Sequence, residues 1–345
     1  MKIAQVSPIF ESVPPKAYGG TERVISYLTE ELVKQGHEVT LFASGDSVTA
    51  ARLVSPIAQS LRPDLARPSW LSYHAIEMDL LAELAHSFDV IHFHTDFLHF
   101  PLARQLNVPH VTTLHGRLDL ADLQPLFRHF HDVPVVSISD NQRTPLPEAN
   151  WQDTVYHGLP ADLYAFQEKP GDYFAFIGRI SYEKRVDRAI DIARQCDVPI
   201  YIGAKIDKAD EPYFNERIKP LLRHPLVQFV GEVNQQEKRE LLEHARALLF
   251  PIDWPEPFGL VMIEAFSCGT PVIAYRHGSV PEIMEDGVTG FVVTNQDEAV
   301  RAAKDIDTVD RKACRAVFDR RFTAAHMAQH YLRVYQRLQG QRRQQ

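Results

Sequence analysis

The sequence predicts an α/β protein built from two doubly wound parallel-sheet domains. Short apolar segments alternate with amphipathic helical patterns, which is typical of parallel strands covered by helices on both faces. This cycle runs twice, and between the two runs, near residues 142–170, the composition shifts to proline, glycine and polar residues. The length of 345 residues also suits two domains of roughly 150 residues each.

The first half begins with an expected strand over residues 2–9 and an amphipathic helix over residues 21–36. Helical periodicity covers residues 74–88 and 120–131. Further strands are expected where short apolar runs recur, at 38–44, 89–94, 110–116, 134–139 and 154–158. These elements form a predicted first domain over residues 1–160.

The second half restarts with a strand at 173–180 and a helix at 186–196. Residues 236–250 indicate a helix that runs into a strand, and residues 259–268 indicate a helix with Gly269 as its C-terminal stop. The other expected elements are strands at 199–204, 227–233, 271–276 and 290–294 and a last helix at 322–339. The predicted second domain is 161–321, and 322–345 forms a separate C-terminal element.

Composition excludes several classes of protein. With 45% hydrophobic and 24% charged residues, neither disorder nor membrane integration is expected, and apolar runs fall short of the roughly 18–20 residues of a spanning helix. The net charge of −8 argues against a nucleic-acid partner. Three distant cysteines without a CxxC, and an N-terminal apolar stretch too short for a signal peptide, indicate a cytoplasmic protein.

Ligands of doubly wound sheets bind at the carboxyl ends of strands, so motifs that directly follow strands are the candidates. The first spans residues 18–21 and contains Gly19 and Gly20, which let the backbone approach a ligand at a helix start that favours anions. Thr21 is a plausible N-cap. A plain tight turn also explains two adjacent glycines.

The second motif, residues 178–185, follows the first strand of the second half. It contains Arg179 and Lys184 on a short loop that enters a helix. A guanidinium and an ammonium can hold a pyrophosphate and neutralise it as it leaves. A solvated charged turn is the alternative.

The third motif, residues 256–264, has an acid at each end. Pro257 suits the first turn of a helix, so the amides of residues 258–260 are expected to be free donors at its positive end. Glu264 replaces an expected core residue, and a buried carboxylate needs partners such as a ribose diol. The two acids lie about 12 Å apart on a helix, farther than the roughly 5–9.5 Å of a glycosidase pair, so we expect separate roles.

The fourth motif is Thr112–Gly116, in which His115 could donate a hydrogen bond to a substrate hydroxyl or could be purely structural.

Together, the Gly19–Gly20 loop, the Arg179–Lys184 loop and the 256–264 motif resemble family 4 of the glycosyltransferases, in the family's order along nearly the whole chain. The resemblance implies the GT-B fold, two Rossmann-like domains facing a central cleft, with the last helix crossing back onto the N-terminal domain. One departure is Arg185, where the family commonly has glycine.

The resemblance also implies roles for single residues. Gly19 and Gly20 would contact the donor phosphates through their backbone, and Arg179 and Lys184 would grip the pyrophosphate. The hexose would be contacted near its reacting carbon by Glu256 and near its 6-hydroxyl by His115. The remaining donor contacts would be the base near Val233, sugar hydroxyls and phosphate at the backbone of Phe258, Gly259 and Leu260, and the ribose at Glu264.

The activity implied is that of a retaining hexosyltransferase with a nucleotide-sugar donor, UDP-glucose as first expectation and GDP-mannose as second. The first domain would bind the acceptor, a hydroxyl of a small molecule or glycan, and the second domain would bind the nucleotide-sugar. Arg179, Lys184 and the helix amides would meet the charge that grows on the leaving phosphate. Neither a metal nor another cofactor is therefore expected.

Two other enzymes stay open. His92 and His94 face one side of a strand and, with Asp96, could bind zinc in a hydrolase. A solvated or acceptor-contacting cluster is the other interpretation of these histidines. A sugar-nucleotide epimerase of the same fold is the second alternative, and a non-catalytic nucleotide-binding module is a third reading.

Overall fold

The computed structural model describes residues 1–17, 19–61 and 69–342, and the chain divides into two compact units. Unit 1 comprises Met1–Gly158 with Ala324–Gln345, and unit 2 comprises Leu159–Thr323. The sequence placed the corresponding divisions after residues 160 and 321. Tyr18, the first residue of the glycine-pair motif, lies outside the described residues. So do residues 62–68 of the domain expected to bind the acceptor.

Unit 1 is built on a parallel sheet in the order β3-β2-β1-β4-β5-β6-β7. This is the doubly wound order, in which the sheet grows in opposite directions from β1 and β4 and opens a switch point between them. The strands are β1 (Lys2–Val6), β2 (Glu38–Phe42), β3 (Arg52–Val54), β4 (Val90–Phe93), β5 (His110–Thr113), β6 (Val135–Ser137) and β7 (Trp151–Thr154).

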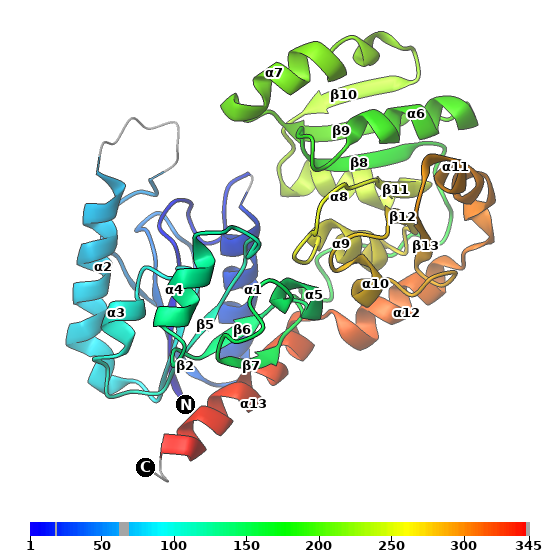
Figure 1. Cartoon of the computed structure of the whole chain (residues 1–345). Helices are drawn as coiled ribbons and strands as arrows, with labels where there is room; N and C mark the ends of the chain where they lie inside the picture. The colour runs from blue at the N-terminus through cyan, green and yellow to red at the C-terminus, as the bar shows by residue number, and fades with distance from the viewer. Residues whose placement is uncertain (18, 62–68, 343–345) are drawn as a thin grey trace. The chain divides into compact units, whose positions relative to one another are not determined.

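Helices cover both faces of this sheet (Figure 1). The side chains of β1 alternate between the two faces. Ala4 and Val6 belong to a core with Leu81 of α2 (Trp70–Leu84). Gln5 faces the other way and donates to the Tyr335 hydroxyl of α13 (Ala324–Arg342). On that second face α1 (Gly20–Lys34) packs against α13. Shorter helices are α3 (Phe100–Ala103), α4 (Leu123–His129) and α5 (Asp140–Arg143).

Unit 2 repeats the arrangement with the parallel order β10-β9-β8-β11-β12-β13 and a switch point between β8 and β11. The two sheets confirm the predicted fold class. The strands are β8 (Phe174–Arg179), β9 (Ile200–Lys205), β10 (Val227–Gly231), β11 (Ala247–Phe250), β12 (Val272–Tyr275) and β13 (Gly290–Val293).

Both faces of the second sheet are covered as well (Figure 1). Ile202 of β9 lies in a core with residues of α6 (Val186–Cys196) and α11 (Gln296–Asp305), which pack together. The next residue, Gly203, faces Leu241 of α8 (Gln235–Glu243) on the opposite side. There α8 packs on α9 (Leu260–Cys268), and α9 on α12 (Arg311–Arg321). The short α7 (Glu211–Tyr213) and α10 (Val280–Ile283) complete the unit.

One element boundary is confirmed and one differs from expectation. Gly269 ends α9 in the left-handed conformation, at φ 79°, as predicted. The last helix begins at Ala324 and not at residue 322, because Phe322 ends α12 as its C-cap. Within the described ranges, no helix combines the length and the apolar character needed to cross a bilayer.

Candidate functional site

The switch point of unit 2 brings together two of the sequence motifs. The loop after β8 carries Lys184, and the loop after β11 carries Glu256. The ammonium of Lys184 forms an ion pair with the Glu256 carboxylate. The same ammonium lies 5.2 Å from the ring centroid of Trp254 and 5.6 Å from that of Phe250, where the faces of aromatic rings attract a cation. Lys184 is therefore held between one carboxylate and two rings.

Glu256 is itself fixed by its surroundings. It is 8% exposed, and the indole Nε1 of Trp254 donates to its Oε2 at 2.9 Å. The backbone is held by Ser279, whose amide donates to the Glu256 carbonyl at 2.9 Å and whose hydroxyl donates to the Phe258 carbonyl at 2.8 Å. A Cβ on Gly278 would lie 2.3 Å from the Glu256 nitrogen, and φ there is +57°, so only glycine fits.

Sequence reasoning missed Gly278 and Ser279 as residues that shape the site. A signal was present, because both follow the predicted strand over 271–276 at its carboxyl end. Ligands of doubly wound sheets bind at the carboxyl ends of strands, so this segment was as good a candidate as the four motifs. Trp254 was missed too, although it stands two residues before Glu256.

Arg179 lies at the end of β8 among acids. Its guanidinium is 3.2 Å from Glu183, 3.6 Å from Asp207 and 3.2 Å from Asp210. Burial raises the pKa of the Asp210 carboxyl, and the positive charge of Arg179 opposes that shift. A diphosphate at Arg179 would have to compete with these carboxylates.

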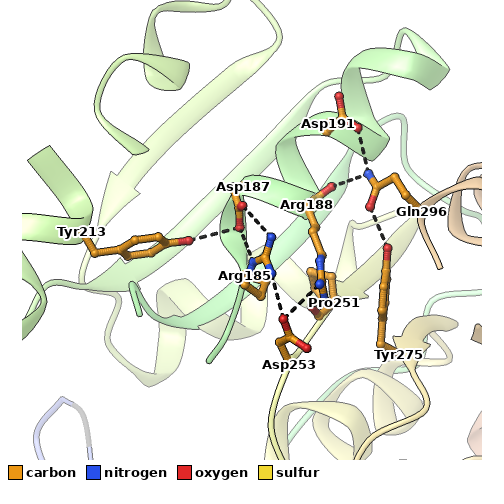
Figure 2. Close-up of polar contacts among 9 residues, drawn as sticks. All are labelled: Arg185, Asp187, Arg188, Asp191, Tyr213, Pro251, Asp253, Tyr275 and Gln296. Atoms are coloured by element: carbon orange, nitrogen blue, oxygen red, sulfur yellow. Dashed lines mark hydrogen bonds and ion pairs between the residues drawn. The ribbon is translucent and has the colours of Figure 1, made fainter. Parts of the chain in front are cut away.

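Arg185, the departure from the family pattern, adopts the conformation that glycine would take. It is the N-cap of α6 at φ 53° and ψ 50°, in the left-handed region. Its side chain binds Asp187 through two nitrogens, each 3.0 Å from a carboxylate oxygen, and Asp253 at 2.8 Å (Figure 2). Arg185 therefore takes a left-handed conformation that favours glycine, and its side chain is held by two carboxylates.

The helix of the third motif begins later than expected. The sequence placed its first turn at Pro257, but α9 begins at Leu260, with Gly259 as N-cap at φ 80°. This φ lies in the left-handed region that favours glycine, and a Cβ on Gly259 would also lie 2.8 Å from the Met262 methyl carbon. Phe258, at 2% exposure, is a core residue in the loop. Of the three expected amides, only that of Leu260 belongs to the first helical turn, whose amides lack intrahelical partners.

The second acid of the motif has a partner that sequence reasoning missed. Glu264 is 2% exposed within α9, and the ammonium of Lys238 on α8 forms an ion pair with its Oε1. Burial of a lone carboxylate would be costly, and this lysine compensates it. Glu256 and Glu264 are thus each paired with a different lysine.

Val233, the residue expected near the base, follows β10 and lies beside the end of β9. Its two methyl carbons are 3.1 Å from the position that a Cβ on Gly203 would take. Gly203 therefore leaves room for Val233. The strand that carries Gly203, β9, leads into Asp207, one of the acids near Arg179.

In unit 1 the glycine pair lies where β1 leads into α1. Gly19 is the N-cap at φ 149°, and the helix begins at Gly20, so Thr21 is not the N-cap that the sequence predicted. A Cβ on Gly19 would be 2.7 Å from the Pro15 Cβ. Burial raises the pKa of Glu22, in the first turn, to about 7. Near neutral pH this carboxyl is partly protonated, which reduces its repulsion of an anion at the helix start.

His115 lies at the end of a hydrogen-bonded chain of side chains. Its Nε2 is 2.8 Å from His94 Nδ1, and His94 Nε2 is 2.8 Å from Gln5 Oε1. Because a carbonyl oxygen only accepts, His94 carries its proton on Nε2 and accepts from His115 at Nδ1. His115 Nδ1 is a buried atom without a hydrogen-bond partner in the described part of the chain. In this tautomer His115 Nδ1 has no proton and can only accept a hydrogen bond, whereas the sequence suggested a donor.

His92 and His94, the pair considered as metal ligands, are buried, which corrects the expectation of a solvated cluster. His92 and His94 lie side by side, with ring centroids 4.1 Å apart, and are 0% and 1% exposed. His92 is hydrogen-bonded at Nδ1 to the Tyr335 hydroxyl and at Nε2 to Thr113, each at 2.7 Å. Both ring nitrogens of His92 are thus engaged in packing α13 against the sheet.

This arrangement leaves the zinc alternative without support. Both nitrogens of His94 are engaged as well, and Asp96 lies in the turn after β4 at φ 50°. Over residues 1–17, 19–61 and 69–342, no group of three or more His, Cys, Asp or Glu side chains is arranged to hold a metal ion.

Comparison with known families agrees with both units. Residues 18–138 match the family described as Glycosyltransferase Family 4, and residues 165–313 match Glycosyl transferases group 1. The two matches cover most of each unit and include every candidate residue named above.

Individual relatives are similar over nearly the whole chain. A phosphatidyl-myo-inositol mannosyltransferase of Mycolicibacterium smegmatis is 26% identical, over 99% of this chain and 95% of its own. Among solved structures, AviGT4, a glycosyltransferase of avilamycin A biosynthesis, superposes with a TM-score of 0.75 at 23% identity, covering 99% and 98% of the two chains. HepE of Anabaena, in complex with UDP-glucose, gives 0.74 at 19% identity, covering 96% and 98%.

The solved structures show the shared fold, and the family matches show the relationship. The two Rossmann-like parallel sheets agree with that shared fold. The chain belongs to family 4 of the glycosyltransferases and has the GT-B fold.

Proposed function

We propose that this glycosyltransferase moves a hexose from a nucleoside diphosphate sugar to a hydroxyl acceptor, with retained anomeric configuration and without a metal ion. The observation that carries the proposal is the Lys184–Glu256 ion pair in front of α9 at the switch point of unit 2. Without donor, the two charges satisfy each other. With donor, the ammonium would turn to the diphosphate and the carboxylate to a sugar hydroxyl.

Positively charged side chains and helix amides would stabilise the leaving diphosphate. Negative charge grows on the phosphate oxygen as its bond to the anomeric carbon breaks. Lys184, Arg179 and the first-turn amides of α9 would stabilise that charge from fixed positions, which makes a divalent metal unnecessary. Gly19 and Gly20 would add backbone contacts to the phosphates.

The acceptor attacks from the side that the phosphate leaves. The acceptor oxygen bonds to the anomeric carbon, the carbon–phosphate oxygen bond breaks, and the acceptor proton passes to the departing phosphate oxygen. Glu256 would orient the hexose, and His115 would accept a hydrogen bond from a sugar hydroxyl at Nδ1. Glu264, freed from Lys238, would accept hydrogen bonds from the ribose diol, while Val233 would pack near the base.

UDP-glucose is the first donor proposed and GDP-mannose the second. HepE, which shares the fold, binds UDP-glucose, and the similar Mycolicibacterium enzyme is a mannosyltransferase. The acceptor is proposed to be a small molecule or a glycan.

Donor turnover tests the proposal. The protein is incubated with UDP-glucose or GDP-mannose in EDTA and a panel of hydroxyl acceptors, and the released diphosphate and product anomer are followed by NMR. We expect release of one nucleoside diphosphate and an α-linked product from an α-linked donor. An inverted product or complete dependence on added metal contradicts the proposal, and a new sugar epimer without acceptor indicates an epimerase.

A further inference from the structure

Arg185 connects the two loops that carry Lys184 and Glu256. It lies next to Lys184 on the loop after β8, and its Nη1 donates to Asp253 Oδ2, on the loop after β11, at 2.8 Å (Figure 2). Asp253 stands three residues before Glu256. The backbone repeats the link, because the Asp253 amide donates to the Glu183 carbonyl at 2.8 Å. The Lys184–Glu256 pair is therefore flanked by two further connections between the same loops.

The connection is anchored at the start of α6. Arg185 binds both oxygens of Asp187 in the first turn of α6, and Tyr213 donates to Asp187 Oδ1 at 3.1 Å. Arg188, one turn further along α6, reaches the same Asp253 oxygen at 3.0 Å. Paired guanidinium–carboxylate contacts of this kind add fixed geometry as well as attraction. Figure 2 shows Arg185 and Arg188 converging on Asp253 from the helix.

The backbone of Arg185 indicates that the side chain has a purpose of its own. At φ 53° a residue with a Cβ is strained, by roughly 1–2 kcal/mol, and glycine would adopt the same conformation without that cost. An arginine at this position therefore destabilises the backbone, and the contacts of its guanidinium offset that cost. Those contacts are Asp187 and Asp253.

We propose that Arg185 is a positioning residue that holds the β8 and β11 loops together so that Lys184 and Glu256 meet the donor diphosphate and hexose in a fixed geometry. The inference rests on the proposed function of that pair. It assigns Arg185 no contact with the donor. Arg185 acts through Asp253, so the two residues should behave as one unit.

Calorimetric binding of UDP, GDP and ADP, together with donor kinetics, tests this. The variants are Arg185→Gly, Arg185→Ala, Asp253→Asn and the double variant Arg185→Ala/Asp253→Asn. The matched control is Arg246→Ala, because Arg246 makes a comparable two-point contact, with Asp307 at 2.9 and 2.6 Å, at the opposite end of β11. Thermal unfolding of each variant verifies folding, and Arg185→Gly provides a variant with an unstrained backbone.

We expect Arg185→Gly, Arg185→Ala and Asp253→Asn each to weaken the diphosphate that the wild type binds by about 10- to 100-fold, the scale of effects from small misplacement of reacting groups. KM for the donor should rise and kcat should fall together. The double variant should be no weaker than the single ones, because the contact is lost once. Arg246→Ala should bind like the wild type.

Three results overturn the inference in distinguishable ways. Wild-type affinity and turnover in Arg185→Gly would show that the side chain positions nothing. A loss in Arg185→Ala without a loss in Asp253→Asn would show that Arg185 touches the diphosphate directly. If the wild type binds none of the three diphosphates, the proposed function fails and the inference fails with it.

Discussion

Lys184 and Glu256 form an ion pair across the switch point of the second sheet, although 72 residues separate them in the sequence. Their side chains are 17% and 11% exposed, so the pair is shielded from solvent on most sides. Such a pair is costly to break by removing one partner, because the other charge is left without compensation. A ligand that offers a phosphate to one partner and a hydroxyl to the other can open it.

Lys184→Ala should lower kcat for transfer by about 100- to 1000-fold, the usual loss when one fixed donor to a developing oxyanion is removed. Initial rates at saturating donor measure this. Lys312→Ala is the matched control, since Lys312 is an exposed lysine of the same unit, paired with Glu168. Near wild-type turnover in Lys184→Ala would show that the leaving-group assignment is wrong.

Lys238→Met should destabilise unit 2 by about 3 kcal/mol, because it leaves the Glu264 carboxylate buried and unpaired. The double variant Lys238→Met/Glu264→Leu should recover most of that loss, since neither charge is then left alone. Urea unfolding measures both, and nucleoside diphosphate affinity should stay low in the double variant. Equal stability of the single variant and the wild type would contradict the pairing.

Gly278→Ala should reduce kcat/KM strongly, because a Cβ at this position would overlap the backbone of Glu256 at 2.3 Å. Gly287→Ala is a matched control in the same unit. It imposes a similar backbone strain, at φ +77°, but its Cβ would meet nothing within 4 Å. If both variants lose the same activity, the effect comes from backbone strain and not from displacement of Glu256.

Unit 1 should lose stability as the pH falls below about 6.5, the pKa of histidine in an unfolded chain. Burial lowers the pKa of His92 and His94 well below its ordinary value and lowers that of His115 to about 3. Protons then bind the unfolded chain and not the folded one, so stability present above pH 6.5 is lost on acidification, at up to about 1.4 kcal/mol per pH unit for each histidine.

Urea unfolding at pH 7.5, 6.5 and 5.5 measures this loss of stability. Hydrogen exchange of the amides of residues 90–115 then locates it in unit 1. His94→Gln should make the pH dependence shallower, because one depressed pKa is removed. A free energy of unfolding of unit 1 that does not change between pH 7.5 and 5.5 would contradict the buried, neutral state of these histidines.

The fold was predictable because its signals are local. Buried parallel strands appear as short apolar runs, and the stop of α9 at Gly269 is written in one residue with a left-handed conformation. Helix starts were harder to predict. Pro257 and Thr21 fit the preferences of a first turn and of an N-cap, but Gly259 and Gly19 are the N-caps, at φ 80° and 149°, where a residue with a Cβ is strained.

The site was only half predictable, because its pairings join distant segments. Lys184 and Glu256 each stood in a recognisable motif, but nothing in the sequence near Lys238 connects it with Glu264. By its spacing His92 resembled a metal ligand, but its hydrogen-bond partner, Tyr335, lies 243 residues away in the sequence. Spacing along one strand cannot show what a helix from the far end of the chain will cover.

Calorimetric titration of the wild-type protein with UDP, GDP and ADP, with and without EDTA, tests the central claim most directly. We predict that one of the three diphosphates binds and that its affinity is the same in EDTA, because Lys184 and Arg179 supply the positive charge. Binding of none of the three, or binding that appears only with added divalent metal, would contradict the donor site described for unit 2.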